Sequence, residues 1–242
     1  MKKPIYYIYE TLKEFIKKRD VHILLDSISH FSRWIKTTRK DYPKAITDFV
    51  PWMNFNAISF LNKFLTKEMT VFEWGSGSST LFLSHRVHKV ISIEHNKEWY
   101  SKVNDMLREY PANNLTYRLI EPEYIGENVD KLNFKDPAHY YSEDKAYEKY
   151  DFKKYVLSIE EYPDKSFDLI IIDGRARPSC LFHSLKKLKD NGYILIDNTE
   201  RDYYLEYFIK SEEYSKYILT ESFAHIPTIN QCSKATLINK KL

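Results

Sequence analysis

The sequence places carboxylates and glycines where a short apolar run gives way to a helix. The run 69–72 predicts a buried strand, and Glu73, Gly75 and Gly77 separate it from a predicted helix over 80–87. Glycine allows the backbone to turn sharply and to lie close to a ligand, and the first turn of a helix has N–H groups without partners inside the helix. Such a strand–turn–helix unit is typical of the ligand-binding first turn of a doubly wound α/β sheet.

The residues around this turn restrict the kind of ligand. A dinucleotide fingerprint needs a third glycine, and Thr80 stands in that place. The carboxylate of Glu73, two residues before Gly75, would repel a pyrophosphate and would attract a ligand that carries an ammonium group. A tight turn in another kind of α/β protein is the alternative.

A second acidic residue lies at the spacing that nucleoside binding requires. Glu94 follows the predicted strand 89–93, about 20 residues after Glu73, which is the offset at which an acid after the second strand reaches a ribose diol. We therefore expect Glu94 to bind a ribose. His95 would lie against the adenine, or would cap or pack the next helix.

Two further acids follow later strands. Asp173 follows the run 167–172, whose nearly continuous apolar residues are typical of a central parallel strand, and Asp197 follows the predicted strand 193–196. The carboxyl ends of parallel strands meet at one edge of a sheet, where ligands bind. Glu73, Asp173 and Asp197 would converge there and repel one another unless a cation lies among them. A ligand sulfonium or a divalent ion would supply that cation.

The glycine turn resembles the first motif of class I S-adenosylmethionine (SAM)-dependent methyltransferases, an acidic residue followed by G-x-G. The resemblance implies a Rossmann-like α/β fold with a doubly wound, mostly parallel seven-stranded sheet, which an antiparallel pair over 217–223 and 235–238 would close. It also implies SAM as cofactor. Ser79, where the family motif usually has glycine, is a departure. The implied cofactor-binding residues are Glu73, Gly75, Ser76, Gly77, Ser78, Ser79, Thr80, Glu94, His95 and Asp173.

Part of the pattern is similar to catechol-type O-methyltransferases. That similarity implies that Asp173, Asp197 and Asn198 hold Mg²⁺, for which oxygen ligands are suited. Those enzymes have a lysine just beyond the aspartate, whereas this chain has Arg175 and Arg177. Arginine stays protonated and cannot act as a base, but it can clamp a carboxylate or phosphate of a substrate. The expected catalytic residues are therefore Asp173, as base or metal ligand, and Arg175. In the alternative, Asp173 acts without a metal and Asp197 and Asn198 cap a helix.

The segments around Glu73, Glu94 and Asp173 more closely resemble a bacterial methyltransferase group that often accompanies surface-polysaccharide genes. This implies O-methylation of a small-molecule or glycan hydroxyl, in polysaccharide biosynthesis. An aminopropyltransferase and a non-catalytic binding module on the same fold are the alternatives. DNA amino-methyltransferases are less compatible, because they carry an Asp/Asn-Pro-Pro-aromatic motif where this chain has Asp173-Gly174-Arg175-Ala176.

Composition restricts partners and location. The 37 lysines and arginines against 34 acids leave a net charge of +3, which argues against a nucleic-acid partner. The two cysteines form no CxxC pair, as expected in a reducing cytoplasm. No apolar run approaches the roughly 18 residues of a membrane span.

Three segments are expected. Residues 1–54 would form an N-terminal helical cap, residues 55–242 the methyltransferase domain, and 122–152 a tyrosine-rich insertion that serves as a substrate-facing lid or as a solvated loop. The cap shows one apolar helix face, which would pack on its own domain or on a second copy, as a homodimer, or would lie on a membrane. The residues of that face are Ile5, Ile8, Tyr9, Leu12 and Ile16.

Overall fold

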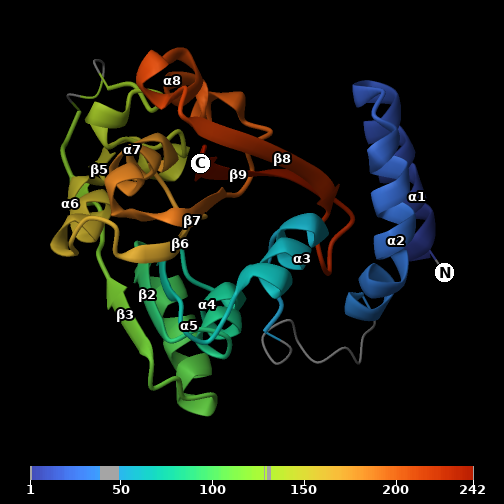
Figure 1. Cartoon of the computed structure of the whole chain (residues 1–242), viewed down its shortest axis with the longest axis horizontal. Helices are drawn as coiled ribbons and strands as arrows, with labels where there is room; N and C mark the ends of the chain where they lie inside the picture. The colour runs from blue at the N-terminus through green and yellow to red at the C-terminus, as the bar shows by residue number, and fades with distance from the viewer. Residues whose placement is uncertain (1, 39–48, 128, 130–131, 242) are drawn as a thin grey trace.

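A seven-stranded sheet forms the centre of the molecule in a computed structural model that describes residues 2–38, 49–127, 129 and 132–241. Its strands are β1 (Thr70–Trp74), β2 (Lys89–Glu94), β3 (Leu115–Leu119), β6 (Phe167–Ile172), β7 (Leu188–Ile196), β8 (Tyr217–His225) and β9 (Cys232–Lys240). Their order is β3-β2-β1-β6-β7-β9-β8, and only the pairs β7–β9 and β8–β9 are antiparallel. The predicted fold, a mostly parallel seven-stranded sheet closed by an antiparallel pair, is confirmed (Figure 1).

Helices flank this sheet. The α-helices are α1 (Lys2–Lys18), α2 (Val21–Thr37), α3 (Phe55–Phe64), α4 (Ser78–Ser84), α5 (Lys97–Glu109), α6 (Lys153–Leu157), α7 (Arg177–Lys187) and α8 (Glu206–Lys210). The 3₁₀ helices are η1 (Pro137–His139), η2 (Lys145–Tyr147), η3 (Ser158–Glu161), η4 (Asp202–Tyr204) and η5 (Glu212–Tyr214). The predicted N-terminal helices are therefore present as α1 and α2.

Alternate residues of the central strands enter two separate cores, one on each face of the sheet. Phe72 and Trp74 pack with residues of α6 and α7, whereas Val71 packs with residues of α3 and α4. Successive side chains of a strand point to opposite faces, so a strand covered by helices on both sides is apolar throughout. This explains the nearly continuous apolar run in β6.

Backbone hydrogen bonds continue one residue past the ends of the parallel strands. The N–H of Gly75 donates to Ile93, that of Asp173 to Trp74 (both 2.9 Å), and that of Asp197 to Ile172 (3.2 Å). These bonds fix the first residue after β1, β6 and β7 in the frame of the sheet. The acids that follow the strands are thus held at one edge by the backbone itself.

The segment 199–210, which follows Asp197 and Asn198, is helical only over η4 and α8. Asn198 has a left-handed conformation (φ 54°), and the N–H of Thr199 donates to the carbonyl of Lys234 at 2.8 Å. The chain is thereby drawn against β9, and α8 begins only at Glu206. The expectation that Asp197 and Asn198 cap a helix is therefore wrong, because no helix begins beside them.

The predicted insertion is a folded part of the domain in its described residues. It contains the antiparallel pair β4 (Glu123–Tyr124) and β5 (Tyr150–Asp151), with η1 and η2 between them. Glu143 accepts hydrogen bonds from Arg201 (3.0 Å) and Tyr204 (2.6 Å), which lie near the C-terminal end of the chain. Residues 128, 130 and 131 of this segment lie outside the described residues.

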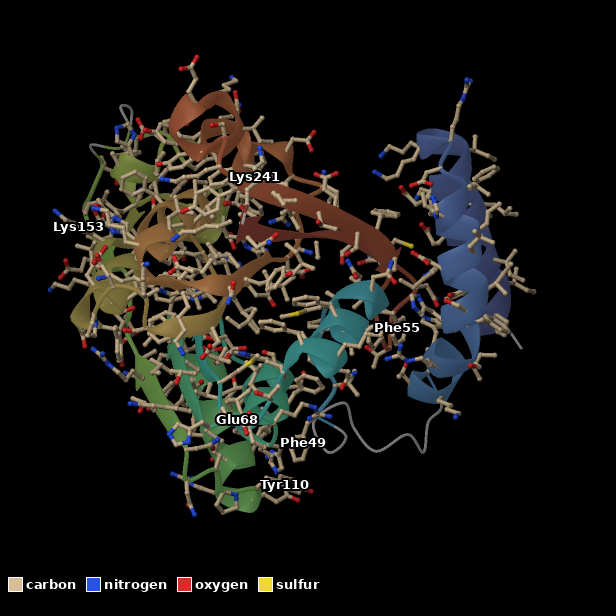
Figure 2. The ribbon with its side chains drawn as sticks, viewed as in Figure 1. Phe49, Phe55, Glu68, Tyr110, Lys153 and Lys241 are labelled. Carbon is tan, nitrogen blue, oxygen red and sulfur yellow. The ribbon has the colours of Figure 1, made fainter. Side chains whose placement is uncertain are left out.

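Helices α1 and α2 lie side by side at the end of the β8–β9 hairpin (Figure 1). The ring of Phe49 stacks on His85 and meets the edge of Tyr110 (Figure 2). No helix among the described residues combines the length and the apolar character needed to span a bilayer.

Candidate active site

Two glycine turns lie against each other at the carboxyl edge of the sheet. Gly75 has φ +88°, and a Cβ there would lie 2.7 Å from the carbonyl carbon of Asp173. A Cβ at Gly174 would lie 2.0 Å from the hydroxyl of Tyr155. The turn after β1 therefore passes the turn after β6 at a distance that admits no side chain on Gly75, and the Tyr155 hydroxyl leaves no room for one on Gly174.

Two adjoining cavities open over these turns. The first, of about 480 Å³, is lined by Trp52, Gly75, Ser76, Glu94, His95, Asn96, Trp99, Tyr147, Asp173, Gly174, Arg175, Arg177, Asp197, Asn198 and Ile226. The second, of about 440 Å³, is lined by Val50, Trp52, Ser76, Gly77, Ser78, Ser79, Trp99, Lys102, Asp105, Met106, Asp173, Pro227 and Thr228. Because they share Trp52, Ser76, Trp99 and Asp173, they form one crevice with Asp173 at the junction.

The guanidinium of Arg177 lies at the centre of the acidic cluster and is 3% exposed. Its Nη2 donates to Oδ1 of Asp173 (3.1 Å) and to Oδ1 of Asn198 (3.2 Å). Nη1 donates to the carbonyl of Asp197, and Nε to the carbonyl of Gly174 (3.1 Å). The cation that the converging carboxylates require is therefore a side chain of the protein.

Burial dominates the electrostatics of this cluster. Burial raises the pKa of Asp173, although the charges of Arg177 and Arg175 oppose the shift. The pKa of Asp197 is raised well above its usual range by burial and by the charge of Asp173. The Oδ1 atom of Asp197 is buried and has no hydrogen-bond partner among the described residues. Asp173, whose side chain is 26% exposed, is thus the more accessible carboxyl of this pair.

The predicted Mg²⁺ site does not fit this arrangement. The expected ligands Asp173 and Asn198 each have a side-chain oxygen within hydrogen-bonding distance of Arg177, so a guanidinium lies where the divalent ion would have to lie. A second cation at this place would be repelled. Across the residues that the structure describes, no group of three His, Cys, Asp or Glu side chains has metal-binding geometry.

Glu94, the expected ribose-binding residue, lines the first cavity, and protein donors surround its carboxylate. Oε2 accepts from the N–H (2.9 Å) and the hydroxyl (2.8 Å) of Ser76, and Oε1 accepts from the N–H groups of His95 and Asn96 (both 2.8 Å). Burial alone would raise its pKa, but the contact with His95 and the backbone donors outweigh it and lower the pKa. Glu94 is therefore an ionised acceptor, and the Ser76 hydroxyl has a second partner in Tyr117 at 2.7 Å.

Glu73 does not line either cavity. Its side chain is fully buried beneath the glycine turn, where Oε2 accepts from Thr80 and Ser92 (both 2.6 Å). Burial raises its pKa to about 7, and hydroxyl hydrogen bonds oppose the shift. Glu73 and Thr80 therefore lie under the turn and support its backbone, instead of lining the crevice as expected.

Some of the other predicted turn residues hold the turn in place by hydrogen bonds, and others line the two cavities. The hydroxyl of Ser78 donates to the carbonyl of Val50 at 2.7 Å, and the N–H of Gly77 donates to Oγ1 of Thr80 at 3.1 Å. Gly75, Ser76, His95, Asp173 and Arg175 line the first cavity, and Gly77, Ser78 and Ser79 line the second.

Aromatic residues that the motifs did not indicate complete the crevice. Trp99 on α5 donates from Nε1 to the carbonyl of Ser76 at 2.7 Å. Tyr147, in the insertion, accepts at its hydroxyl from Asn96 at 3.1 Å, and Asp144 pairs with Arg175 at 2.7 Å. The excess of tyrosine in the insertion was the one sequence feature that could have indicated Tyr147. No sequence pattern indicated Trp52 or Trp99, because their positions in the crevice depend on how segments far apart in the chain pack.

Comparison with known proteins shows the fold of this chain. No family model and no curated protein matches the sequence. The O-methyltransferase TomG from Streptomyces achromogenes, involved in tomaymycin synthesis and solved with SAM, is similar with a TM-score of 0.52 and 11% identity, over 85% of this chain and 82% of that chain. Precorrin-6y C5,15-methyltransferase from Geobacter metallireducens is similar with a TM-score of 0.51 and 16% identity, over 76% of this chain and 87% of that chain.

A third solved structure, assigned as an rRNA methylase from Clostridium thermocellum, gives a TM-score of 0.50 at 16% identity, over 80% of this chain and 99% of that chain. The names of these three proteins state three different kinds of acceptor or pathway. Similarity at this level of identity is informative about the fold and not about the acceptor. The chain has the Rossmann-like fold that these methyltransferases share.

Proposed function

We propose that this protein is a SAM-dependent methyltransferase that methylates a hydroxyl of a small molecule or glycan. The observation that carries the proposal is the position of Asp173. Its carboxyl lies at the junction of the two cavities, beside the Gly75 turn and in contact with Arg177. Glu94, the acid proposed to bind the ribose, lines the same crevice.

The residues present suit the parts of SAM. When bound, SAM supplies an electrophilic methyl group on a sulfonium. Glu94 would accept hydrogen bonds from the ribose hydroxyls if the Ser76 hydroxyl turned to its other partner, Tyr117. Lys102, which lines the second cavity, has the charge that a carboxylate of the amino-acid end requires.

Asp173 is the proposed base. A carboxyl whose pKa is raised by burial binds a proton more strongly than an exposed aspartate, and a base is most effective when its pKa approaches the working pH. Arg177 donates to one oxygen of Asp173 and so fixes the orientation of the carboxyl. Because methyl transfer is an in-line displacement, the protein mainly has to orient the acceptor hydroxyl and remove its proton.

Two features of the cavity favour a sugar or a sugar-linked acceptor. Trp52, Trp99 and Tyr147 present aromatic rings to it, and such rings can stack on the apolar face of a sugar. Nε of Arg175 is buried and lacks a hydrogen-bond partner in the part of the chain that the structure describes, so it can donate to a phosphate or carboxylate of the acceptor. The link with surface polysaccharides and the cytoplasmic location remain predictions.

We expect Asp173→Asn to lower methyl transfer by about 10²–10⁴-fold, because the variant keeps the shape of the carboxyl but not its basicity. The test uses methyl-labelled SAM with three acceptor pools, namely small metabolites, sugar nucleotides with oligosaccharides, and RNA. Wild-type protein should label one of the first two pools, and the variant should not, while it binds S-adenosylhomocysteine (SAH) as the wild type does. Labelling of RNA alone, or undiminished labelling by the variant, would overturn the proposal.

A further inference from the structure

The N-terminal hairpin, α1 with α2, exposes its apolar side. The apolar face expected on α1 is exposed and does not pack on the described part of its own domain. The exposed apolar side chains of the hairpin are Ile5, Tyr6, Ile8, Tyr9, Leu12, Ile16, Val21, Leu25 and Ile28. Figure 2 shows side chains that project from the hairpin away from the sheet.

The inner side of the hairpin is made of different residues. On α1, Tyr7 stacks on His225 of β8 with ring centres 3.6 Å apart, and Thr11 lies 2.9 Å from Nε2 of the same histidine. On α2, Trp34 is fully buried and donates from Nε1 to the carbonyl of Ile229 at 2.8 Å. The hairpin is therefore anchored by one side, and its opposite side is exposed.

The outward side is large enough for a stable interface. Its side chains are between 47% and 75% exposed, so together they present roughly 1,000 Å², against roughly 300–600 Å² for the largest apolar patch of an ordinary monomer. A standard interface needs about 800 Å² from each partner. We propose that the outward faces of α1 and α2 bind the same faces of a second copy, in a two-fold symmetric dimer with a four-helix interface.

The charges in the middle of α1 suit a second copy as the partner. The helix carries five lysines and two glutamates, and in its middle acids and bases alternate, as Glu10, Lys13, Glu14 and Lys17. Lys13 pairs with Glu10 at 2.9 Å. In a symmetric pair this mixed stretch offers opposite charges to its own copy.

The proposed dimer also bears on the crevice. The N–H of Thr228 donates to Oγ1 of Thr37 on α2 at 3.0 Å. Thr228 and Pro227 line the second cavity, and Ile226 lines the first. A second copy on the hairpin would therefore stabilise the helices that hold one wall of the crevice, although the association itself does not depend on the proposed methyl transfer.

Sedimentation velocity of the full chain at about 20 μM tests the inference. The molecular mass of the wild-type protein in this experiment should be twice the 29.1 kDa of one chain. The double variant Ile16→Glu with Ile28→Glu, at the two most exposed positions (71% and 75%), should sediment as one chain, because two buried charges should weaken association by about 100-fold or more. The matched control Ile209→Glu, at an exposed position (64%) on α8, should remain a dimer.

An unchanged melting temperature and unchanged SAH binding in the double variant would show that the chain still folds, so that loss of the dimer reflects the interface. A wild-type chain that is monomeric at this concentration would overturn the inference, as would a double variant that stays dimeric. Co-sedimentation of monomeric wild-type protein with phosphatidylserine-containing vesicles would overturn it in favour of a membrane surface. A dimer that binds no SAH would leave the inference standing and remove the proposed function.

Discussion

Replacing Gly75 by alanine is expected to abolish cofactor binding and to lower the free energy of unfolding by about 3–5 kcal/mol. Two effects add. Alanine would have to keep a left-handed φ of +88°, and its Cβ would lie within 2.8 Å of backbone atoms of Asp173 and Gly174. Those atoms follow β6 and cannot move without disturbing the junction of the cavities. Urea unfolding and SAH titration measure the two losses.

Gly126→Ala is the matched control for this prediction. Gly126 also has a positive φ, of +79°, but a Cβ there meets no atom within 4 Å. Only the cost of holding alanine in a left-handed conformation should remain, which lowers the free energy of unfolding by about 1 kcal/mol. SAH binding should not change. A Gly75→Ala variant as stable as Gly126→Ala would show that the two turns do not approach each other as closely as described.

Replacing Arg177 by methionine is expected to lower the free energy of unfolding by about 3–5 kcal/mol near pH 8, because it leaves buried carboxyls without their cation. Arg175→Met is the control two residues away. The side chain of Arg175 is 30% exposed and pairs only with Asp144 among the described ionised groups, so its loss should change the free energy of unfolding by less than about 1 kcal/mol.

The loss in Arg177→Met should depend on pH. Burial already raises the pKa values of Asp173 and Asp197 in the folded protein, and removal of the guanidinium raises them further. A carboxyl whose pKa is higher in the folded than in the unfolded protein stabilises the folded state at pH values below its unfolded-state pKa. This stabilisation is lost as the pH rises through its folded-state pKa. The difference from wild type should therefore be small near pH 4 and largest near pH 8. An equal loss at both values would mean that Arg177 acts by packing alone.

The arrangement of acids at the sheet edge could be predicted because it depends on local sequence. Parallel strands that end on Glu94, Ile172 and Ile196 bring their following residues to one edge, and apolar runs locate such strands. The need for a cation among the acids also followed from charge. The sequence did not reveal that Arg177 is this cation. Its position depends on Ala176, whose left-handed conformation (φ +48°) turns the chain so that α7 begins at Arg177.

The N-terminal hairpin shows a second limit of sequence patterns. Periodicity correctly identified an apolar face on α1, but it does not say what covers that face. The residues that pack on the domain are Tyr7 and Thr11, and their partners lie more than 200 residues away in β8. Glu73 is similar. The motif placed it at the end of the first strand, and it is the last residue but one of β1. Only the packing of Thr80 and Ser92 around it showed that it lies under the turn.

Calorimetric titration of SAH into the protein in the presence of EDTA tests the central claim most directly, because the crevice is proposed to bind this cofactor with its own arginine as the buried cation. The predicted result is binding with a micromolar dissociation constant, about −8 kcal/mol, that added Mg²⁺ does not change. Absence of binding both in EDTA and in Mg²⁺ would contradict the cofactor assignment. Binding that appears only with Mg²⁺ would contradict the role given to Arg177.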